Sequence, residues 1–180
     1  MGILKRVYRF VGSFSLLNKR NKILILGLDK AGKSTLLKEL ARRRPGGFQH
    51  ILHPTSEELV IQDVRYVAIN YGGQQQGRPL WSDHLNDVVG ILFLVDVADH
   101  KRFGEVKAEL DALLATNKMQ KIPIVVLGNK IDHLYAVSEE ELCYELGLER
   151  ICGRPIKLCM CSLALRQGYG EALRWLAHHI

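Results

Sequence analysis

The sequence predicts a single α/β domain in which a mostly parallel sheet carries helices on both faces. From residue 22 onward, apolar runs of strand length alternate with stretches of helical period, which is the pattern of strand–helix–strand units. The runs at 90–96 and 123–128 are apolar almost throughout, as expected of strands that are covered on both faces. The chain has 180 residues, close to the usual length of one domain. We therefore expect one domain at 22–180, preceded by an arm at 1–21.

Each element is predicted from its own pattern. The first strand, KILILG, is a short buried run, and the helix that follows places Leu36, Leu37 and Leu40 on one side. Two strand-like stretches flank Asp63-Val64, which indicates a hairpin turn between them. In chain order the expected strands are 22–27, 57–62, 65–70, 90–96, 123–128 and 156–161, and the expected helices are 33–43, 102–117, 138–146 and 169–178.

The composition is that of a soluble globular protein, with 47% apolar and 24% charged residues. The net charge of +6 is confined to residues 1–22, because the chain from the first acidic residue, Asp29, onward holds equal numbers of basic and acidic residues. A nucleic-acid-binding domain usually spreads its cations over a folded face, so we expect no nucleic-acid partner. No apolar run reaches the length of about 18 residues that spans a membrane.

All four cysteines lie between residues 143 and 161. A single residue separates Cys159 from Cys161, a spacing that differs from that of zinc-binding pairs, and no second Cys/His pair lies at the distance seen in zinc fingers. We therefore expect buried free thiols, which are typical of proteins in a reducing compartment.

A phosphate-binding motif follows the first predicted strand. The segment 27–34, GLDKAGKS, fits G-x-x-x-x-G-K-[ST] and lies between a strand and a helix, which an incidental glycine-rich turn would not require. In this motif the glycines let backbone N–H groups surround the phosphates, and the helix start adds its positive end. The lysine reaches the β- and γ-phosphates, and the serine hydroxyl binds Mg²⁺. The candidate nucleotide-binding residues here are Asp29, Lys30, Ala31, Gly32, Lys33, Ser34 and Thr35.

A guanine-binding pattern, N-K-x-D, follows the predicted strand at 123–128. Its candidate binding residues are Asn129, Lys130 and Asp132. The carboxylate of Asp132 can accept hydrogen bonds from guanine N1–H and from the 2-amino group, which adenine does not offer in that arrangement. Four residues alone are a weak signal. Two motifs in chain order, each directly after a strand, are a much stronger one, because ligands of parallel sheets bind at the carboxyl ends of the strands.

These motifs are similar to those of Ras-superfamily small GTPases, and the chain resembles the Arf/Sar family, most closely the Sar type that initiates coat protein complex II (COPII) assembly on the endoplasmic reticulum. HPTSEEL and RQGYGE favour Sar over Arf. The resemblance implies a Ras-like G domain, a P-loop NTPase that hydrolyses GTP to GDP with Mg²⁺. The matching stretches are GLDKAGKST, HPTSEEL at 53–59, GGQ at 72–74, GILFLVDVADHKRF at 90–103, GNKID and CSLALRQGYGEALRWLA at 161–177.

The resemblance also implies roles for residues outside the two motifs. Thr55 would be the switch I threonine whose hydroxyl closes on Mg²⁺ when the γ-phosphate is present, with an ordinary loop threonine as the alternative. Gly73 would donate its N–H to the γ-phosphate and so sense the nucleotide state. Ser162 and Leu163 would bring backbone close to the guanine edge.

Two positions depart from the pattern of the Sar type. Asn70 stands where the D-x-G-G motif has an aspartate that holds Mg²⁺ through a water molecule. Asparagine keeps an acceptor oxygen but loses the charge, which predicts weaker Mg²⁺ binding and faster nucleotide release. Gln74 replaces a histidine and is similar to the glutamine with which Ras and Arf orient the attacking water. The candidate catalytic residues are therefore Gln74 and Lys33, with a surface glutamine as the alternative for position 74.

The arm is predicted to form an amphipathic helix. Large apolar residues from Ile3 to Leu17, Phe10 among them, fall on one face at helical period, whereas Lys5, Arg9 and Ser13 fall on the opposite face. Such a helix suits an anionic membrane surface. Packing on the domain itself is the alternative, and the resemblance supports both in turn, with the arm docked in the GDP state and released in the GTP state. Acylation of Gly2 is not expected, because position 6 lacks the Ser or Thr of the myristoylation motif.

Together these features predict a cytoplasmic GTP switch that is peripheral on endoplasmic reticulum and Golgi membranes and initiates COPII vesicle formation. An Arf-like GTPase of another trafficking step is one alternative, and a nucleotide-binding switch with little hydrolysis because of Asn70 is another. No arginine finger is identifiable from the sequence, so fast turnover is expected to need an activating protein. The other expected partners are an exchange factor and coat subunits, and the protein is expected to be monomeric in solution.

Overall fold

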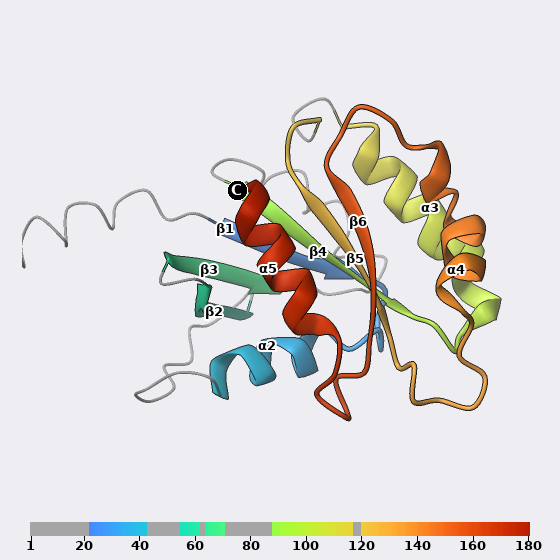
Figure 1. The fold of residues 1–180 in the computed structure, drawn as a ribbon, viewed down its shortest axis with the longest axis horizontal. Coiled ribbons are helices and arrows are strands. Elements are labelled where there is room, and N and C mark those ends of the chain that lie inside the picture. The colour runs from blue at the N-terminus through green and yellow to red at the C-terminus, as the bar shows by residue number, and fades with distance from the viewer. Residues whose placement is uncertain (1–21, 43–54, 62–63, 71–87, 117–119) are drawn as a thin grey trace, which may run out of the picture.

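The computed structural model describes residues 22–42, 55–61, 64–70, 88–116 and 120–180. Within these ranges six strands form one sheet in the order β2-β3-β1-β4-β5-β6, in which only β2 runs antiparallel to its neighbour (Figure 1). The strands are β1 (Lys22–Gly27), β2 (Thr55–Ile61), β3 (Val64–Asn70), β4 (Val88–Asp96), β5 (Ile124–Asn129) and β6 (Ile156–Cys161). The helices are α2 (Lys33–Arg42), α3 (Phe103–Leu114), α4 (Glu139–Leu146) and α5 (Tyr169–His179), with 3₁₀ turns η3 (His100–Arg102) and η5 (Leu148–Arg150).

The sheet is apolar on both faces, because successive side chains of a strand point to opposite sides. In β1, Leu24 and Leu26 join the core under α3 and α4, whereas Ile23 and Ile25 join the core under α2 and α5. Figure 1 shows the two helix pairs on opposite sides of the sheet. The predicted α/β class, a mostly parallel sheet with helices on both faces, is therefore confirmed.

Several predicted boundaries were wrong by one to three residues. Ile61 pairs with Val64, so Val64 belongs to β3 rather than to the turn, because a two-residue connection lets the whole antiparallel ladder pair. The ladder also extends to Thr55, two residues before the predicted start of that strand. Helix α3 ends at Leu114 instead of residue 117, and a separate 3₁₀ turn at 100–102 precedes its first residue, Phe103.

The four cysteines are free, as predicted, but they are not all buried. Cys159 and Cys161, both in β6, are buried in the hydrophobic core. Cys152 is exposed because it lies in the loop before that strand, and Cys143 is half-buried on α4. Burial of all four thiols was therefore a wrong prediction.

The carboxyl ends of the parallel strands are in register at one edge of the sheet. Asp96 in β4 pairs with Asn129 in β5, and Asn129 pairs in turn with Cys161 at the end of β6. At the other side of β1, Asn70 pairs with Ile25. The loops that carry the predicted motifs therefore leave the sheet side by side. The arm at 1–21 lies outside the described residues, among which no helix has the length and apolarity needed to cross a membrane.

Candidate nucleotide-binding site

The loop between β1 and α2 requires its glycines. Gly27 and Gly32 have φ of +131° and +108°, in the region that favours glycine. A Cβ on Gly32 would lie 2.3 Å from Asn129 Nδ2, so this glycine is also needed for the close approach of the two motifs. The N–H of Leu36 donates to Gly32 O at 2.9 Å, which starts α2 directly at the loop. The positive end of this helix therefore faces the loop, where a phosphate would be favoured.

Lys33 is a buried cation at the start of α2, only 7% exposed. Its Nζ donates to Gly27 O at 2.9 Å and to Leu28 O at 2.7 Å, so the ammonium group lies on the carbonyls of the loop. Ser34 and Thr35, in the same first turn, are exposed. A serine hydroxyl is a hard oxygen ligand of the kind that Mg²⁺ prefers, so this position fits the predicted metal.

Two further predicted positions are placed by their backbone alone. Thr55 and Asn70 are register partners across β2 and β3, and Asn70 is also the partner of Ile25, two residues before Gly27. Both backbone positions therefore lie at the edge of the sheet that carries the phosphate motif. Their side chains are outside the described part of the structure, as are Gly73 and Gln74 altogether.

Asn129 connects the three segments of the site. Its side chain is 3% exposed, and its Nδ2 donates to Ala31 O at 2.9 Å. Its Oδ1 accepts the N–H of Leu163 at 3.1 Å. One amide thus holds the phosphate motif, the N-K-x-D motif and the loop after β6 together. The pattern predicted a role for Asn129 at the base, but it gave no sign of this bracing contact.

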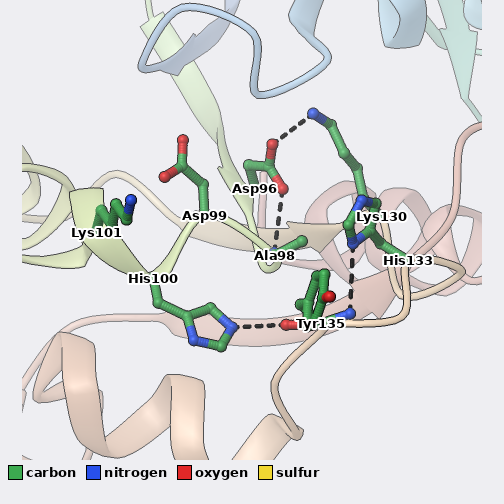
Figure 2. A pocket seen from close by; sticks show the side chains of 8 residues that line it. All are labelled: Asp96, Ala98, Asp99, His100, Lys101, Lys130, His133 and Tyr135. Atoms are coloured by element: carbon green, nitrogen blue, oxygen red, sulfur yellow. Dashed lines mark hydrogen bonds and ion pairs between the residues drawn. The ribbon is translucent and has the colours of Figure 1, made fainter.

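Lys130, the second residue of the motif, has a positive φ of 76° and extends toward β4. Its Nζ forms an ion pair with Asp96 Oδ2, and the same carboxylate accepts the N–H of Ala98 at 3.1 Å through Oδ1. A cavity of about 470 Å³ opens beside this pair, and His100, His133 and Tyr135 are among its other lining residues (Figure 2). The ion pair fixes the long side chain of Lys130 across the ends of β4 and β5.

Asp132 is exposed, and its carboxylate is held in the charged form. Its pKa is lowered chiefly by a hydrogen bond with the Ser162 side chain, and the backbone N–H of Asp132 adds to the effect. Ser162 itself is fully buried, and its Oγ accepts the N–H of Leu165 at 3.0 Å. Paired backbone bonds between Ser162 and Gln167 close the loop. An ionised carboxylate thus faces solvent at the position where the base is expected.

One contact of the site was missed by the sequence prediction. Arg102 donates from Nη1 to Asp29 Oδ1 at 2.8 Å and from Nη2 to Asp29 O at 3.1 Å. Its Nε donates to Asp99 Oδ2 at 2.6 Å. Burial lowers the pKa of Arg102, but the hydrogen bonds and charges of Asp99 and Asp29 outweigh this and leave it above the ordinary value. The stretch at 90–103, which contains Arg102, was recognised as similar to the family. No spacing in the sequence relates Arg102 to Asp29, which lies 73 residues earlier.

A phosphate motif and an N-K-x-D motif, joined at the carboxyl edge of a parallel α/β sheet, are typical of the P-loop proteins that bind guanine nucleotides. The ADP-ribosylation factor family model matches residues 7–180 of the chain. The protein belongs to this family and is a small GTPase of the Arf/Sar type, which binds guanine nucleotide and hydrolyses GTP.

Similar proteins include both Sar and Arf-like members of the family. The chain is 34% identical to the small COPII coat GTPase SAR1 of Giardia intestinalis, over 98% of this chain and 96% of the relative. It is 35% identical to the protein of the same name from Nicotiana tabacum, over 96% of each chain. It is also 34% identical to ADP-ribosylation factor-like protein 3 of Caenorhabditis elegans, over 88% of this chain and 87% of that one.

Proposed function

We propose that this GTPase is a membrane-recruited switch that initiates COPII vesicle formation in transport from the endoplasmic reticulum to the Golgi. Two relatives that match nearly the whole chain are named as small COPII coat GTPases, which supports this role. In the proposed cycle an exchange factor loads GTP, the arm at 1–21 binds the membrane, and coat subunits are recruited. An activating protein then stimulates hydrolysis.

The observation that carries the nucleotide site is the bracing of three segments by Asn129. Because it fixes the phosphate loop relative to the base loop, one ligand can contact both. We assign the phosphates to residues 29–35 at the start of α2 and the guanine edge to Asp132, whose charge and exposure suit hydrogen bonds from N1–H and the 2-amino group. Lys130 and the loop at Ser162 and Leu163 line the same end.

In the proposed hydrolysis a water oxygen forms a bond to the γ-phosphorus while the bond to the β–γ bridging oxygen breaks. The proton of the water ends on the released phosphate. Gln74 orients the water, and Lys33 offsets the charge that develops on the phosphoryl oxygens. When bound, Mg²⁺ would be held by Ser34 and Thr55 and would neutralise part of the same charge. Gly73 donates its N–H to the γ-phosphate and so reports which nucleotide is bound.

The replacement at Asn70 motivates a second candidate, a switch that holds nucleotide but hydrolyses it slowly. The backbone of Asn70 lies beside β1 near the phosphate loop, where the charge of an aspartate would support a metal. Single-turnover GTP hydrolysis by the native chain and by Asn70→Asp, at several Mg²⁺ concentrations and with an activating protein, separates the candidates. Native turnover above the solution rate supports the switch that hydrolyses GTP. Turnover by Asn70→Asp without turnover by the native protein supports the slow switch.

Liposome flotation tests the recruitment. With anionic liposomes, purified COPII inner-coat subunits and the full-length protein, we expect coat subunits to float with a non-hydrolysable GTP analogue and not with GDP. Phe10→Glu, on the apolar face of the arm, is expected to abolish flotation, whereas Ser13→Glu, on its polar face, is the matched control and is expected to float.

The same assay distinguishes an Arf-like role, which the relative named ADP-ribosylation factor-like protein 3 favours. GTP-dependent flotation of the GTPase without coat subunits would support that role and count against the COPII proposal. Equal flotation of Phe10→Glu and Ser13→Glu would contradict recruitment through the arm.

A further inference from the structure

Arg102 is fixed between two carboxylates that come from different parts of the chain. Its Nε bonds Asp99 within the same 3₁₀ turn, and its two terminal nitrogens bond a carboxylate oxygen and the backbone carbonyl of Asp29. A planar guanidinium that makes three such bonds has one orientation, because its donors lie in a rigid fork. Arg102 is therefore a fixed link between the turn before α3 and the phosphate loop.

The loop that is expected to hold the phosphates carries an acidic residue, Asp29. A nucleotide carries several negative charges, and a carboxylate close to them raises the free energy of the bound state. Asp29 lies in the loop between Gly27 and Lys33, and its side chain is 45% exposed, so water screens only part of its charge. Some feature of the protein has to offset this charge for phosphate to bind well.

The position of Arg102 supplies that offset. Helices α2 and α3 cover opposite faces of the sheet, and the phosphates are expected at the start of α2 (Figure 1). The bond from Arg102 Nη1 holds the carboxylate of Asp29 on the α3 side of the loop, and the bond from Nη2 holds the loop backbone.

We propose that Arg102 is a positioning residue for guanine nucleotide binding. It pairs with Asp29, cancels the charge of that carboxylate and keeps it away from the phosphates. This inference rests on the proposed assignment of the phosphates to residues 29–35. Arg102 touches the loop and not the nucleotide, so its effect acts through Asp29 and disappears when Asp29 carries no charge.

The dissociation rate of fluorescently labelled GDP from the full-length protein, in millimolar Mg²⁺, tests the proposal. Arg102→Ala leaves the carboxylate unpaired, and we expect release about tenfold faster, a difference that shrinks at high salt because the effect is electrostatic. Asp29→Asn serves only as the reference background, in which the further change Arg102→Ala should alter the release rate by less than about twofold. Lys101→Ala removes the neighbouring exposed cation, for which the described part of the structure shows no bond to Asp29, and is the matched control.

The outcomes separate the two proposals. If the native protein does not bind labelled GDP, the assigned nucleotide site fails and the role of Arg102 fails with it. If the native protein binds GDP and Arg102→Ala releases it at the native rate, only the present inference is overturned. An Arg102→Ala effect that persists in the Asp29→Asn background also overturns it, because a purely structural role of Arg102 would not depend on that charge.

Arg102→Lys keeps the positive charge but loses the fork. It provides the decisive comparison if Arg102→Ala does not fold. We expect GDP release about threefold faster than the native rate, because a lysine ammonium lacks the rigid planar fork that holds Asp29 and Asp99 at the same time. A native release rate for Arg102→Lys would overturn the positioning role.

Discussion

The base end and the phosphate end of the candidate site are built from different interactions. At the base end, Asn129 and Ser162 are 3% and 0% exposed; the Asn129 side chain bonds the backbone of two other segments, and the Ser162 side chain bonds the backbone of its own loop. At the phosphate end, Asp29 and Arg102 form an ion pair whose side chains are 45% and 25% exposed. The contacts of Asn129 and Ser162 are therefore buried neutral hydrogen bonds, whereas the contact of Asp29 with Arg102 is a partly solvated ion pair.

This difference teaches where binding and folding are coupled. A buried group that loses its partner costs about 1–3 kcal/mol, so loss of the Asn129 contacts is expected to lower stability as well as nucleotide affinity. A partly exposed ion pair contributes about 0–1 kcal/mol, so changes to Asp29 or Arg102 are expected to alter affinity while the fold persists.

The largest effect is expected from Asn129→Ala. The change leaves the carbonyl of Ala31 and the N–H of Leu163 without their partner. We expect the free energy of unfolding to fall by about 2–5 kcal/mol, together with loss of GDP binding. Urea denaturation followed by circular dichroism measures the first effect. Asp132→Asn, an exposed isosteric change three residues later, is the control and should leave the midpoint in place. Equal midpoints for Asn129→Ala and the native protein would contradict the coupling.

Gly32→Ala is expected to disturb the contacts of Asn129 from the side of the phosphate loop. The new Cβ would lie 2.3 Å from Asn129 Nδ2. The alanine would also have to adopt the φ of +108° of this residue, which alanine avoids. The expected loss of stability is about 1–3 kcal/mol, with weaker GDP binding. Gly104→Ala in α3, whose Cβ would meet nothing within 4 Å, is the control and should gain about 0.5–1 kcal/mol from the removal of a helical glycine. A stable Gly32→Ala protein with native GDP affinity would refute the expected clash.

The charge of Asp132 gives a pH prediction. The pKa of Asp132 is lowered, chiefly by the hydrogen bond with Ser162. The carboxylate is therefore charged at any pH above the ordinary carboxyl pKa, and its hydrogen bonds to guanine are lost only as the pH falls through the lowered value. Titration of Asp132 is therefore expected to leave GDP affinity flat from about pH 8 to about pH 5. Isothermal titration across this range tests it. A tenfold fall in GDP affinity across this range, seen in the native protein and absent in a variant at position 132, would contradict the prediction.

The smallest effect concerns the thiols. Burial raises the pKa of Cys161 to about 12 and also raises that of Cys159, whereas Cys152 is exposed. Because the thiolate is the reactive form, iodoacetamide should modify Cys152 in the folded protein and spare the two cysteines of β6. Mass spectrometry of timed samples follows each site. Modification of Cys161 as fast as that of Cys152 would show that β6 is less well buried.

Much of this architecture could be predicted, because its signals are local. The strand at 124–129 and the motif that follows it are contiguous in the sequence, and the helix at 33–42 starts at the phosphate motif itself. Helix period, apolar runs and fixed motif spacing each depend on neighbours within about ten residues, so they can be recognised in the sequence without knowledge of the fold. The two motifs and the family resemblance are consequently contained in the sequence alone.

The contacts that join these segments could not be predicted in the same way. Arg102 bonds Asp29 across 73 residues, and Asn129 bonds Ala31 across 98. Such pairs depend on which strands lie side by side, and the N-K-x-D pattern suggested only a base contact for Asn129. The predicted helix at 102–117 included Arg102, which is instead the last residue of a separate 3₁₀ turn at 100–102.

Exchange of base specificity tests the central claim most directly, namely that the carboxyl edge braced by Asn129 is a guanine site with Asp132 at the base. An asparagine at position 132 would donate to the 2-oxo group of xanthine instead of accepting from the 2-amino group of guanine. For Asp132→Asn we predict that GDP affinity falls at least about 100-fold, while xanthosine diphosphate binds about as tightly as GDP binds the native protein. Undiminished GDP binding by Asp132→Asn, with no gain for xanthosine diphosphate, would contradict the account.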